Sequence, residues 1–408
     1  MNTTTSHAVP AAIERLDLPE ASSYAGQSVR AAERELERTP AASVAVLDAT
    51  YANTHRFPAP GYALTAFTEA ASGAGMTYTP YVGDNGVRAT VAANIEEHLG
   101  LTATGDVDLI LAPGTQGALF IALSAIIEPG DLVILPDPDY LSTERTLRYL
   151  GAEVERVSVS FEDAAGRPTL DADRLRELAD RSPKLFIFSH PNNPTGAIYS
   201  DETLELIAEL ARTRDFLVLA DQLYCRLVYD GEAYTHIAEL EGMRERTITT
   251  LGPSKTESLS GYRLGLAVAP VELIERMEDV QSITALRAPA YAQHVLAHWL
   301  AEDGEYVAER TVEYQALRDW TVERLNASPA FSATRSWGTS YIFPRVLAPV
   351  SDQELAIAIK ERAGVIVNPG YQFGAEGVGH MRLCIAQDEA GWRDALERLI
   401  AVTESFLP

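Results

Sequence analysis

Lysine is scarce in this sequence, so chemistry that needs a primary amine has few candidates. Among the 33 Lys and Arg residues, only Lys184, Lys255 and Lys360 are lysines. Lys255 lies with Arg263 in SKTESLSGYRLG, a Ser- and Gly-rich segment between two apolar runs. A lysine in such a loop is either a solvated surface cation or an amine held beside a ligand, where it can act as a nucleophile or base.

Polar side chains follow two further apolar runs. HPNNPTG comes after KLFIFS, and its prolines, asparagines and glycine predict a sharp turn that holds Asn193 at a strand end. ADQLYCRLVYDG comes after FLVL and places Asp221 at another strand end, with Tyr224 three residues later. Asp221 could also be a helix cap. If the strands are parallel, all three side chains would lie at the same edge of the sheet, where the strands end.

An anion site is predicted where APGTQGAL follows the run VDLIL. Gly114 and Thr115 would begin a helix whose free backbone N–H groups and dipole attract negative charge. GTQG alone is weak evidence, but Arg263 would add a permanent cation for the same anion.

The elements that must position these residues are short buried strands alternating with helices, from about residue 90 to 285. The strand candidates are VDLILAP, DLVILPDP, KLFIFSHP, FLVLADQ, TITTLGP and LGLAVAP. Between two of them, residues 201–215 show a helical period with one apolar face and Ser200 as N-cap; the face is formed by Leu204, Ile207, Ala208 and Ala211. This alternation predicts an α/β fold with a mostly parallel sheet covered by helices on both sides, and a ligand beyond the carboxyl ends of the strands.

The last hundred residues predict a smaller α+β domain. A long amphipathic helix is expected at about 305–327, short strands around SYIFPRV and GVIVNPG, and a final helix with Trp392, Ala395, Leu396 and Leu399 on one face. The N-terminal segment, helical near AAERELERT, is expected to join this domain. We therefore expect a large domain at 59–290, and a small domain from 1–58 and 291–408.

Composition excludes several classes of partner. The 408 residues are 46% hydrophobic and 22% charged, which suffices for a large core, and the formal net charge of −25 argues against nucleic acid or an anionic membrane. Cys225 and Cys384 match no metal or redox spacing, and no metal is predicted. No secretory signal and no run of about 18 apolar residues is seen, so a cytoplasmic protein is expected.

The motifs resemble those of the class I/II pyridoxal-phosphate-dependent aminotransferases, the fold type I enzymes typified by aspartate aminotransferase. The resemblance covers roughly residues 60 to 400. It rests on PNNPTG at 191–196, D-x-x-Y at 221–224, S-K-x(7)-R-L-G at 254–265, and PGYQFG with MRLCIA at 369–386.

The resemblance implies how pyridoxal 5'-phosphate would be held. Lys255 would bind it as an internal aldimine and then move the Cα proton, and Asp221 would pair with the pyridinium nitrogen so that the ring accepts electrons. Tyr224 and Asn193 would hydrogen-bond the phenolic oxygen, and Asn193 would also meet the substrate. Tyr140, in PDPDYLS, would stack on the ring, although it could also be a core tyrosine.

The same resemblance implies the sites of phosphate and carboxylate. Gly114, Thr115 and Arg263 would bind the cofactor phosphate, with Gln116 and Ser254 as further contributors. The carboxylate site involves Arg382 in the C-terminal part of the chain.

Arg382, in MRLCIA, matches the arginine that grips the substrate α-carboxylate, although a surface arginine would fit the same strand end. Tyr78 resembles the tyrosine that reaches the phosphate of the neighbouring subunit, which implies a homodimer with shared active sites.

The sequence departs from the family pattern at several positions. A glycine-containing loop that covers the substrate is replaced by DATYANTHRFPAPGY, where Asn53 and His55 could meet a substrate or serve as a second acid/base, or lie in a solvated loop. Arg287 could receive a side-chain carboxylate or lie in a dimer interface. Gln222 replaces an acidic residue, and Gly252 replaces a serine that binds phosphate in many relatives, for which Ser254 could compensate.

These observations predict an enzyme that moves an amino group between an α-amino acid and a 2-keto acid through the pyridoxamine form. The alternative keeps the cofactor but changes the reaction to β- or γ-elimination, replacement, cyclisation or oxidation, guided by the unusual 49–62 loop. A ligand-binding module of a transcription regulator is a third class, which would need a DNA-binding segment that is not visible. The amino acid used and the pathway are not indicated.

Overall fold

The computed structural model describes residues 10–16, 46–73, 78–161 and 167–408. At its centre is an eight-stranded sheet with the order β2-β9-β8-β7-β6-β3-β4-β5. The strands are β2 (Leu109–Pro113), β3 (Leu132–Asp137), β4 (Glu153–Ser160), β5 (Thr169–Leu170), β6 (Leu185–Ser189), β7 (Leu217–Asp221), β8 (Thr247–Leu251) and β9 (Leu264–Val268).

The six predicted runs all lie in this sheet, and the α/β fold with a mostly parallel sheet is confirmed. Strands β4, β3, β6, β7 and β8 pair in parallel. The exceptions are β9, which is antiparallel to both β2 and β8, and β5, which is antiparallel to β4. The carboxyl ends of β3, β6, β7 and β8 therefore meet at one edge.

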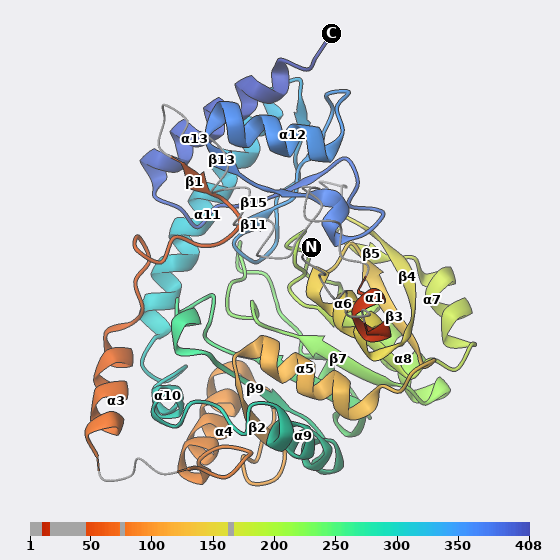
Figure 1. The fold of residues 1–408 in the computed structure, drawn as a ribbon, viewed down its shortest axis with the longest axis vertical. Helices are drawn as coiled ribbons and strands as arrows, with labels where there is room; N and C mark the ends of the chain where they lie inside the picture. The colour runs from red at the N-terminus through yellow and green to blue at the C-terminus, as the bar shows by residue number, and fades with distance from the viewer. Residues whose placement is uncertain (1–9, 17–45, 74–77, 162–166) are drawn as a thin grey trace, which may run out of the picture.

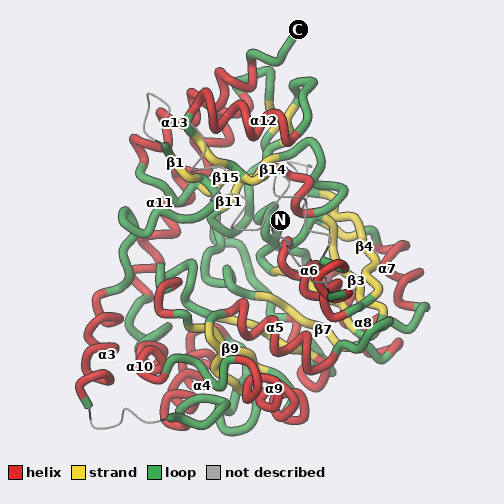
Figure 2. Tube along the Cα trace, viewed as in Figure 1, coloured by secondary structure: helices red, strands yellow, loops and turns green. Residues whose placement is uncertain are grey.

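Helices cover both faces of the sheet (Figure 2). Successive strand residues point to opposite faces, so each strand contributes to two cores. Leu185 and Ile187 pack in the core formed with α5 and α9, whereas Phe186 and Phe188 pack in the core formed with α7 and α8. The predicted helix is α8, in which Ser200 accepts a hydrogen bond from the Thr203 N–H and the four expected residues are buried. The covering helices are α4 (Asn85–Leu99), α5 (Thr115–Ile126), α6 (Leu141–Leu150), α7 (Ala172–Ala179), α8 (Asp201–Arg214) and α9 (Val271–Thr284).

The C-terminal part packs on its own apolar core above the sheet (Figure 1). The predicted long helix is α11 (Gly304–Asn326), and the predicted final helix is α13 (Glu389–Glu404), with its four expected residues buried. A short sheet has the order β11-β15-β14. The remaining elements there are α12 (Asp352–Ala358), β10 (Phe331–Ser332), β11 (Tyr341–Ile342), β12 (Arg345–Val346), β13 (Val365–Ile366), β14 (Asn368–Pro369) and β15 (Met381–Cys384).

The chain before the large sheet reaches this C-terminal part. Strand β1 (Leu47–Asp48) pairs in parallel with β13. The helix expected near AAERELERT lies outside the described residues, and the division at 58 and 290 stays a prediction. The other helices are α1 (Ala11–Glu14), α3 (Gly61–Ser72) and α10 (Ala290–Gln293), with one-turn helices η1 (Ile237–Glu239), η2 (Arg244–Arg246), η3 (Ser260–Tyr262), η4 (His294–Ala297), η5 (Ile359–Ala363) and η6 (Gly370–Phe373).

Among the described helices, none combines the length and the apolar character needed to cross a bilayer.

Candidate active site

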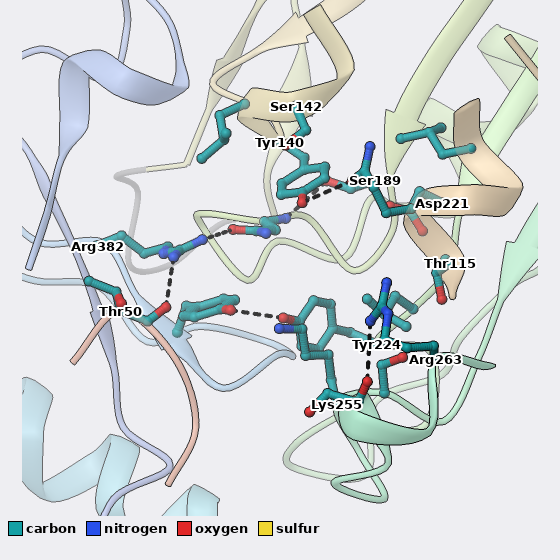
Figure 3. Close-up of a pocket in the computed structure, with 18 residues that line it drawn as sticks. Thr50, Thr115, Tyr140, Ser142, Ser189, Asp221, Tyr224, Lys255, Arg263 and Arg382 are labelled. Atoms are coloured by element: carbon teal, nitrogen blue, oxygen red, sulfur yellow. Dashed lines mark hydrogen bonds between the residues drawn. The ribbon is translucent and has the colours of Figure 1, made fainter. Parts of the chain in front are cut away.

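A cavity of about 440 Å³ lies between the carboxyl ends of the sheet strands and the strands β11 and β15. Ten of the residues predicted from the sequence line it: Thr115, Gln116, Tyr140, Asn193, Asp221, Tyr224, Ser254, Lys255, Arg263 and Arg382. In Figure 3, Arg382 and Thr50 lie on one side of the cavity, Thr115 and Asp221 on the opposite side, and Tyr140, Tyr224 and Lys255 between them. The cavity therefore has two poles, with the amine of Lys255 in the middle.

One pole is a concave site for an anion, here called the anion cup, formed by Gly114, Thr115, Ser254 and Arg263. Gly114, the N-cap of α5, has φ of +84°, and a Cβ built on it would lie 2.4 Å from Nη2 of Arg263. The guanidinium therefore touches the start of the helix, where unpaired N–H groups and the dipole favour negative charge. Arg263 Nη1 donates to the Ser260 carbonyl at 3.2 Å, and the Ser254 hydroxyl donates to the Leu264 carbonyl at 3.3 Å. A phosphate dianion fits this set of donors.

Asp221 lies at the end of β7, opposite Thr250 in the register of β7 with β8. The Thr250 hydroxyl donates to Asp221 Oδ1 at 3.0 Å. Loss of hydration raises the pKa of Asp221 to about 6, and the bond from Thr250 opposes this rise. A cationic partner, such as a protonated ring nitrogen, would restore the ionised form.

A buried carboxylate organises the loops that carry Tyr140 and Asn193. Asp139 accepts hydrogen bonds from the Ser189 N–H at 3.1 Å, from Asn192 Nδ2 at 2.9 Å and from the Tyr140 N–H at 2.5 Å. Burial raises the pKa of Asp139 to about 7. The Tyr140 hydroxyl donates to Gln116 Oε1 at 3.2 Å, so this tyrosine lines the cavity and is not a core residue.

The other pole is Arg382, which is only 6% exposed, so it is not the surface arginine that the strand end also allowed. Its Nη1 donates to Asn193 Oδ1 at 2.9 Å, and its Nη2 donates to Asn368 Oδ1 at 2.6 Å and to the Thr50 carbonyl at 2.9 Å. Its Cζ lies 4.1 Å from the centre of the Tyr341 ring. Within the described residues, its buried Nε has no hydrogen-bond partner. A planar cation fixed in this way suits a carboxylate.

Tyr224 is fully enclosed, and its hydroxyl hydrogen-bonds the Tyr341 hydroxyl at 2.9 Å. Burial holds the pKa of Tyr224 well above its usual range, so the phenol is a neutral donor.

Two predicted residues of the N-terminal loop do not line the cavity. Asn53 Oδ1 accepts hydrogen bonds from the backbone N–H groups of His55, at 3.0 Å, and Arg56, at 3.2 Å. Arg56 forms an ion pair with Glu313 at 3.4 Å. Asn53 is thus the cap of a local turn, and His55 is exposed on it, as the alternative of a solvated loop predicted.

Tyr78 and Arg287 also lie outside the cavity, but they lie together. The Cζ of Arg287 is 4.4 Å from the centre of the Tyr78 ring, and Tyr78 is 83% exposed. Both residues line a separate hollow with Pro113 and Tyr291. Tyr78 is predicted to reach the cofactor of a neighbouring subunit, and Arg287 either to receive a side-chain carboxylate of the substrate or to lie in a dimer interface. Both roles stay predictions.

Sequence reasoning missed several residues that position the site. Thr50 acts through its backbone carbonyl, which leaves no signal in residue type. Asn368 is the cross-strand partner of Arg382 in β14 and β15, and the alternation of those two strands could have indicated it. Tyr341 lies in a predicted strand, and Thr250 is one of several threonines in another predicted strand, so neither stood out by residue type. Asp139 comes directly after a predicted strand, where a carboxylate could also be a turn residue.

Comparison with known proteins identifies the family of this chain. The family model described as "Aminotransferase class I and II" matches residues 48–399. The chain is 31% identical over 329 residues to aromatic-amino-acid aminotransferase 2 of Thermococcus litoralis, covering 80% of this chain and 84% of that protein. It is 31% identical over 350 residues to the aspartate/prephenate aminotransferase of Thermus thermophilus, covering 85% and 88%. The crystal structure of an aspartate aminotransferase from Rhodobacter sphaeroides superposes with a TM-score of 0.87 at 34% identity, covering 93% of this chain and all of that one.

Proposed function

The chain belongs to the class I and II aminotransferases and is therefore an amino-group transferase, and we propose that it works with pyridoxal 5'-phosphate bound through Lys255. The observation that carries the proposal is the convergence in one cavity of a lysine amine, an aspartate at a strand end and an anion cup, with a buried arginine at the opposite side. Amino acid and keto acid are its expected substrates.

The residues present fit this cofactor. The space beside Arg263 that a Cβ on Gly114 would fill suits the phosphate, and Asp221, at the end of β7 in the same cavity, would pair with the ring nitrogen. Tyr140 offers a ring face, and Tyr224 and Asn193 offer donors for the phenolic oxygen. The bound cofactor would supply an electron-accepting ring that stabilises negative charge at the substrate Cα.

The protein's own groups supply positioning and proton transfer. The guanidinium of Arg382 would bind and orient the α-carboxylate, and so fix which bond at Cα faces the ring. The Nζ of Lys255 would take the proton from Cα and return it elsewhere on the reacting group, as the general base and acid of the site. Asn193 joins the two tasks, because its side chain already accepts a hydrogen bond from Arg382.

Transamination is favoured over elimination, cyclisation or oxidation by the position of His55 in the N-terminal loop. That loop was the feature that suggested a different reaction, yet His55 is exposed on a capped surface turn and is absent from the residues lining the cavity.

The test is a half-reaction with single amino acids. The purified protein should absorb near the visible edge, and an accepted amino acid should convert this band to that of the pyridoxamine form without ammonia release. Lys255→Ala should bind the cofactor only non-covalently and lose turnover by several orders of magnitude, while Lys184→Ala, at an exposed position, should behave as wild type. Full turnover in Lys255→Ala, or release of ammonia without a keto-acid acceptor, would refute the proposal.

We further propose a cytoplasmic homodimer with shared active sites. The support for a dimer is the exposed Tyr78 beside Arg287, which offers a phenol to a neighbouring copy. Tyr78→Phe should weaken cofactor binding in the dimer without changing its mass by light scattering. A monomer with full activity would contradict it.

A further inference from the structure

A buried group of charged residues lies behind the loops that carry Lys255 and Tyr224. Arg226 follows Tyr224 by two residues, and Glu257 follows Lys255 by two residues. Arg226 forms one ion pair with Glu257 and a second with Asp303, at 2.7 Å from Nη2 to Oδ1. One guanidinium therefore bridges the loop after β8 and the residue that precedes α11.

Neutral donors complete the cluster from two other elements. Trp299 Nε1 donates to Glu257 Oε1 at 3.0 Å, and the Tyr62 hydroxyl of α3 donates to Asp303 Oδ2 at 2.9 Å. The side chain of Glu257 is 1% exposed, that of Asp303 is not exposed, and that of Arg226 is 11% exposed. None of these residues lines the catalytic cavity.

Such a cluster is costly to bury unless each charge is paired, and it has two carboxylates for one guanidinium. The imbalance shows in Glu257, since burial raises its pKa to about 7, while Arg226 opposes the rise and Asp303 adds to it. A well-packed apolar cluster would hold these elements at least as firmly, so stability alone gives no reason for this arrangement.

The Lys255 loop needs an external attachment. Inside the loop, the Ser258 N–H reaches the Lys255 carbonyl at 3.4 Å and the Leu259 N–H reaches the Pro253 carbonyl at 3.2 Å, both at the long end of the hydrogen-bond range. Glu257 instead ties the loop to Arg226, whose own loop carries Tyr224. The position of an amine on a flexible four-carbon chain depends on where its backbone is held.

We propose that Glu257 and Arg226 are positioning residues of the transfer reaction, whose ion pair sets the loop of Lys255 against the loop of Tyr224 so that amine and phenol enter the cavity in register. The inference rests on the proposed function, because it concerns the two groups that would meet the cofactor. Neither side chain lines the catalytic cavity, so both would act through the backbone of their loops.

The test compares Glu257→Gln with Asp108→Asn in the holoenzyme. Glutamine keeps the shape of Glu257 but not its charge. Asp108 is a matched control, because it is also a buried carboxylate paired with an arginine, Arg244, at 3.4 Å, but it lines a different cavity. The readouts are the rate and amino-acid KM of the half-reaction, the pH midpoint of the bound-cofactor absorbance, and the thermal midpoint.

We expect Glu257→Gln to lower the half-reaction rate about 10- to 100-fold, the effect of a shift of about 1 Å in a catalytic group, with KM changed less than about threefold. The pH midpoint of the absorbance should move by about half a unit or more, because the surroundings of the Lys255 nitrogen change. Asp108→Asn should lower the thermal midpoint but keep the rate and the pH midpoint of wild type. Arg226→Lys keeps the charge but not the fork to two carboxylates, and should give a smaller effect in the same direction.

If Glu257→Gln does not fold, Arg226→Lys carries the test. The inference is overturned if the folded variants keep the wild-type rate and pH midpoint and lose only stability. A wild-type protein that shows no half-reaction with any amino acid would instead overturn the proposed function, so the two failures are distinct.

Discussion

Replacing Arg382 by lysine tests how much of substrate selection depends on a planar cation. Three of the five N–H donors of the guanidinium are used by Asn193, Asn368 and the Thr50 carbonyl. The remaining donors are the unpaired Nε–H and one Nη1–H, and a carboxylate can accept a charge-assisted hydrogen bond from either. A lysine ammonium has three donors, for which the same three acceptors would compete.

The expected loss is one charge-assisted hydrogen bond to the α-carboxylate, worth about 1.5–3 kcal/mol. This corresponds to a fall of about 10- to 150-fold in kcat/KM for every amino acid alike, because a change of about 1.4 kcal/mol alters kcat/KM tenfold. The rate of the half-reaction would be measured over a range of amino-acid concentrations, and cofactor affinity would be measured by titration.

Two comparisons make this result specific. Cofactor affinity should change little in Arg382→Lys, because Arg382 lies at the pole opposite the anion cup (Figure 3). Arg324→Lys alters a surface arginine paired with Glu397 and should leave both quantities unchanged. An Arg382→Lys protein with kcat/KM within about threefold of wild type would refute the assignment, because the lost bond is worth at least tenfold.

Two further predictions concern the cofactor. Burial raises the pKa of Asp221 to about 6 in the protein without cofactor, and a protonated ring would lower it. Cofactor affinity should therefore fall as the pH drops below about 6, by up to about tenfold per pH unit. Asp221→Asn should abolish that dependence in a titration from pH 5 to 8, and should raise the thermal midpoint of the cofactor-free protein at pH 7.5, because an ionised, unpaired Asp221 destabilises the fold above its raised pKa. Gly114→Ala should weaken cofactor binding about tenfold or more, because the new Cβ would lie 2.4 Å from Arg263 Nη2, whereas Gly130→Ala, at φ of +93° with nothing within 4 Å, should cost only stability. Equal cofactor affinity in the two alanine variants would contradict the close approach of Arg263.

The strands of the sheet were predictable where they are buried on both faces. Runs such as KLFIFS and FLVLAD are continuous and apolar because helices cover both sides of the parallel sheet. Strand β4 was missed because it lies towards the edge, next to β5, and its sequence EVERVSVS alternates charged or polar residues with valines, with only Val157 and Val159 buried. An alternating pattern of that kind gives a weaker signal than a continuous one.

The candidate site was predictable where a residue acts through a side chain at a strand end. Asp221, Asn193 and Lys255 all follow buried strands, and the parallel topology brings such positions together. The contact of Arg382 with Thr50 was not predictable, because Thr50 offers only a backbone carbonyl from a distant segment. The sequence left two positions open for His55, and the structure has the solvated one for a local reason: Asn53 caps its backbone, and this Asx turn holds His55 on the surface.

The replacement of serine by glycine at position 252 follows from how closely three segments meet at the anion cup. A Cβ on Gly252 would lie 2.7 Å from Thr115 Oγ1, and a Cβ on Gly265 would lie 2.2 Å from the Thr115 nitrogen. The side chain of Thr115 therefore occupies the space that a serine at 252 would need, and the first turn of α5 can approach β9 only because residue 265 has no side chain. The hydroxyl groups available to an anion are accordingly those of Thr115 and Ser254, both of which line the cavity. Thr115, 137 positions away in sequence, therefore constrains residue 252, so the departure from the family pattern changes which hydroxyl groups line the anion cup and leaves the cup itself in place.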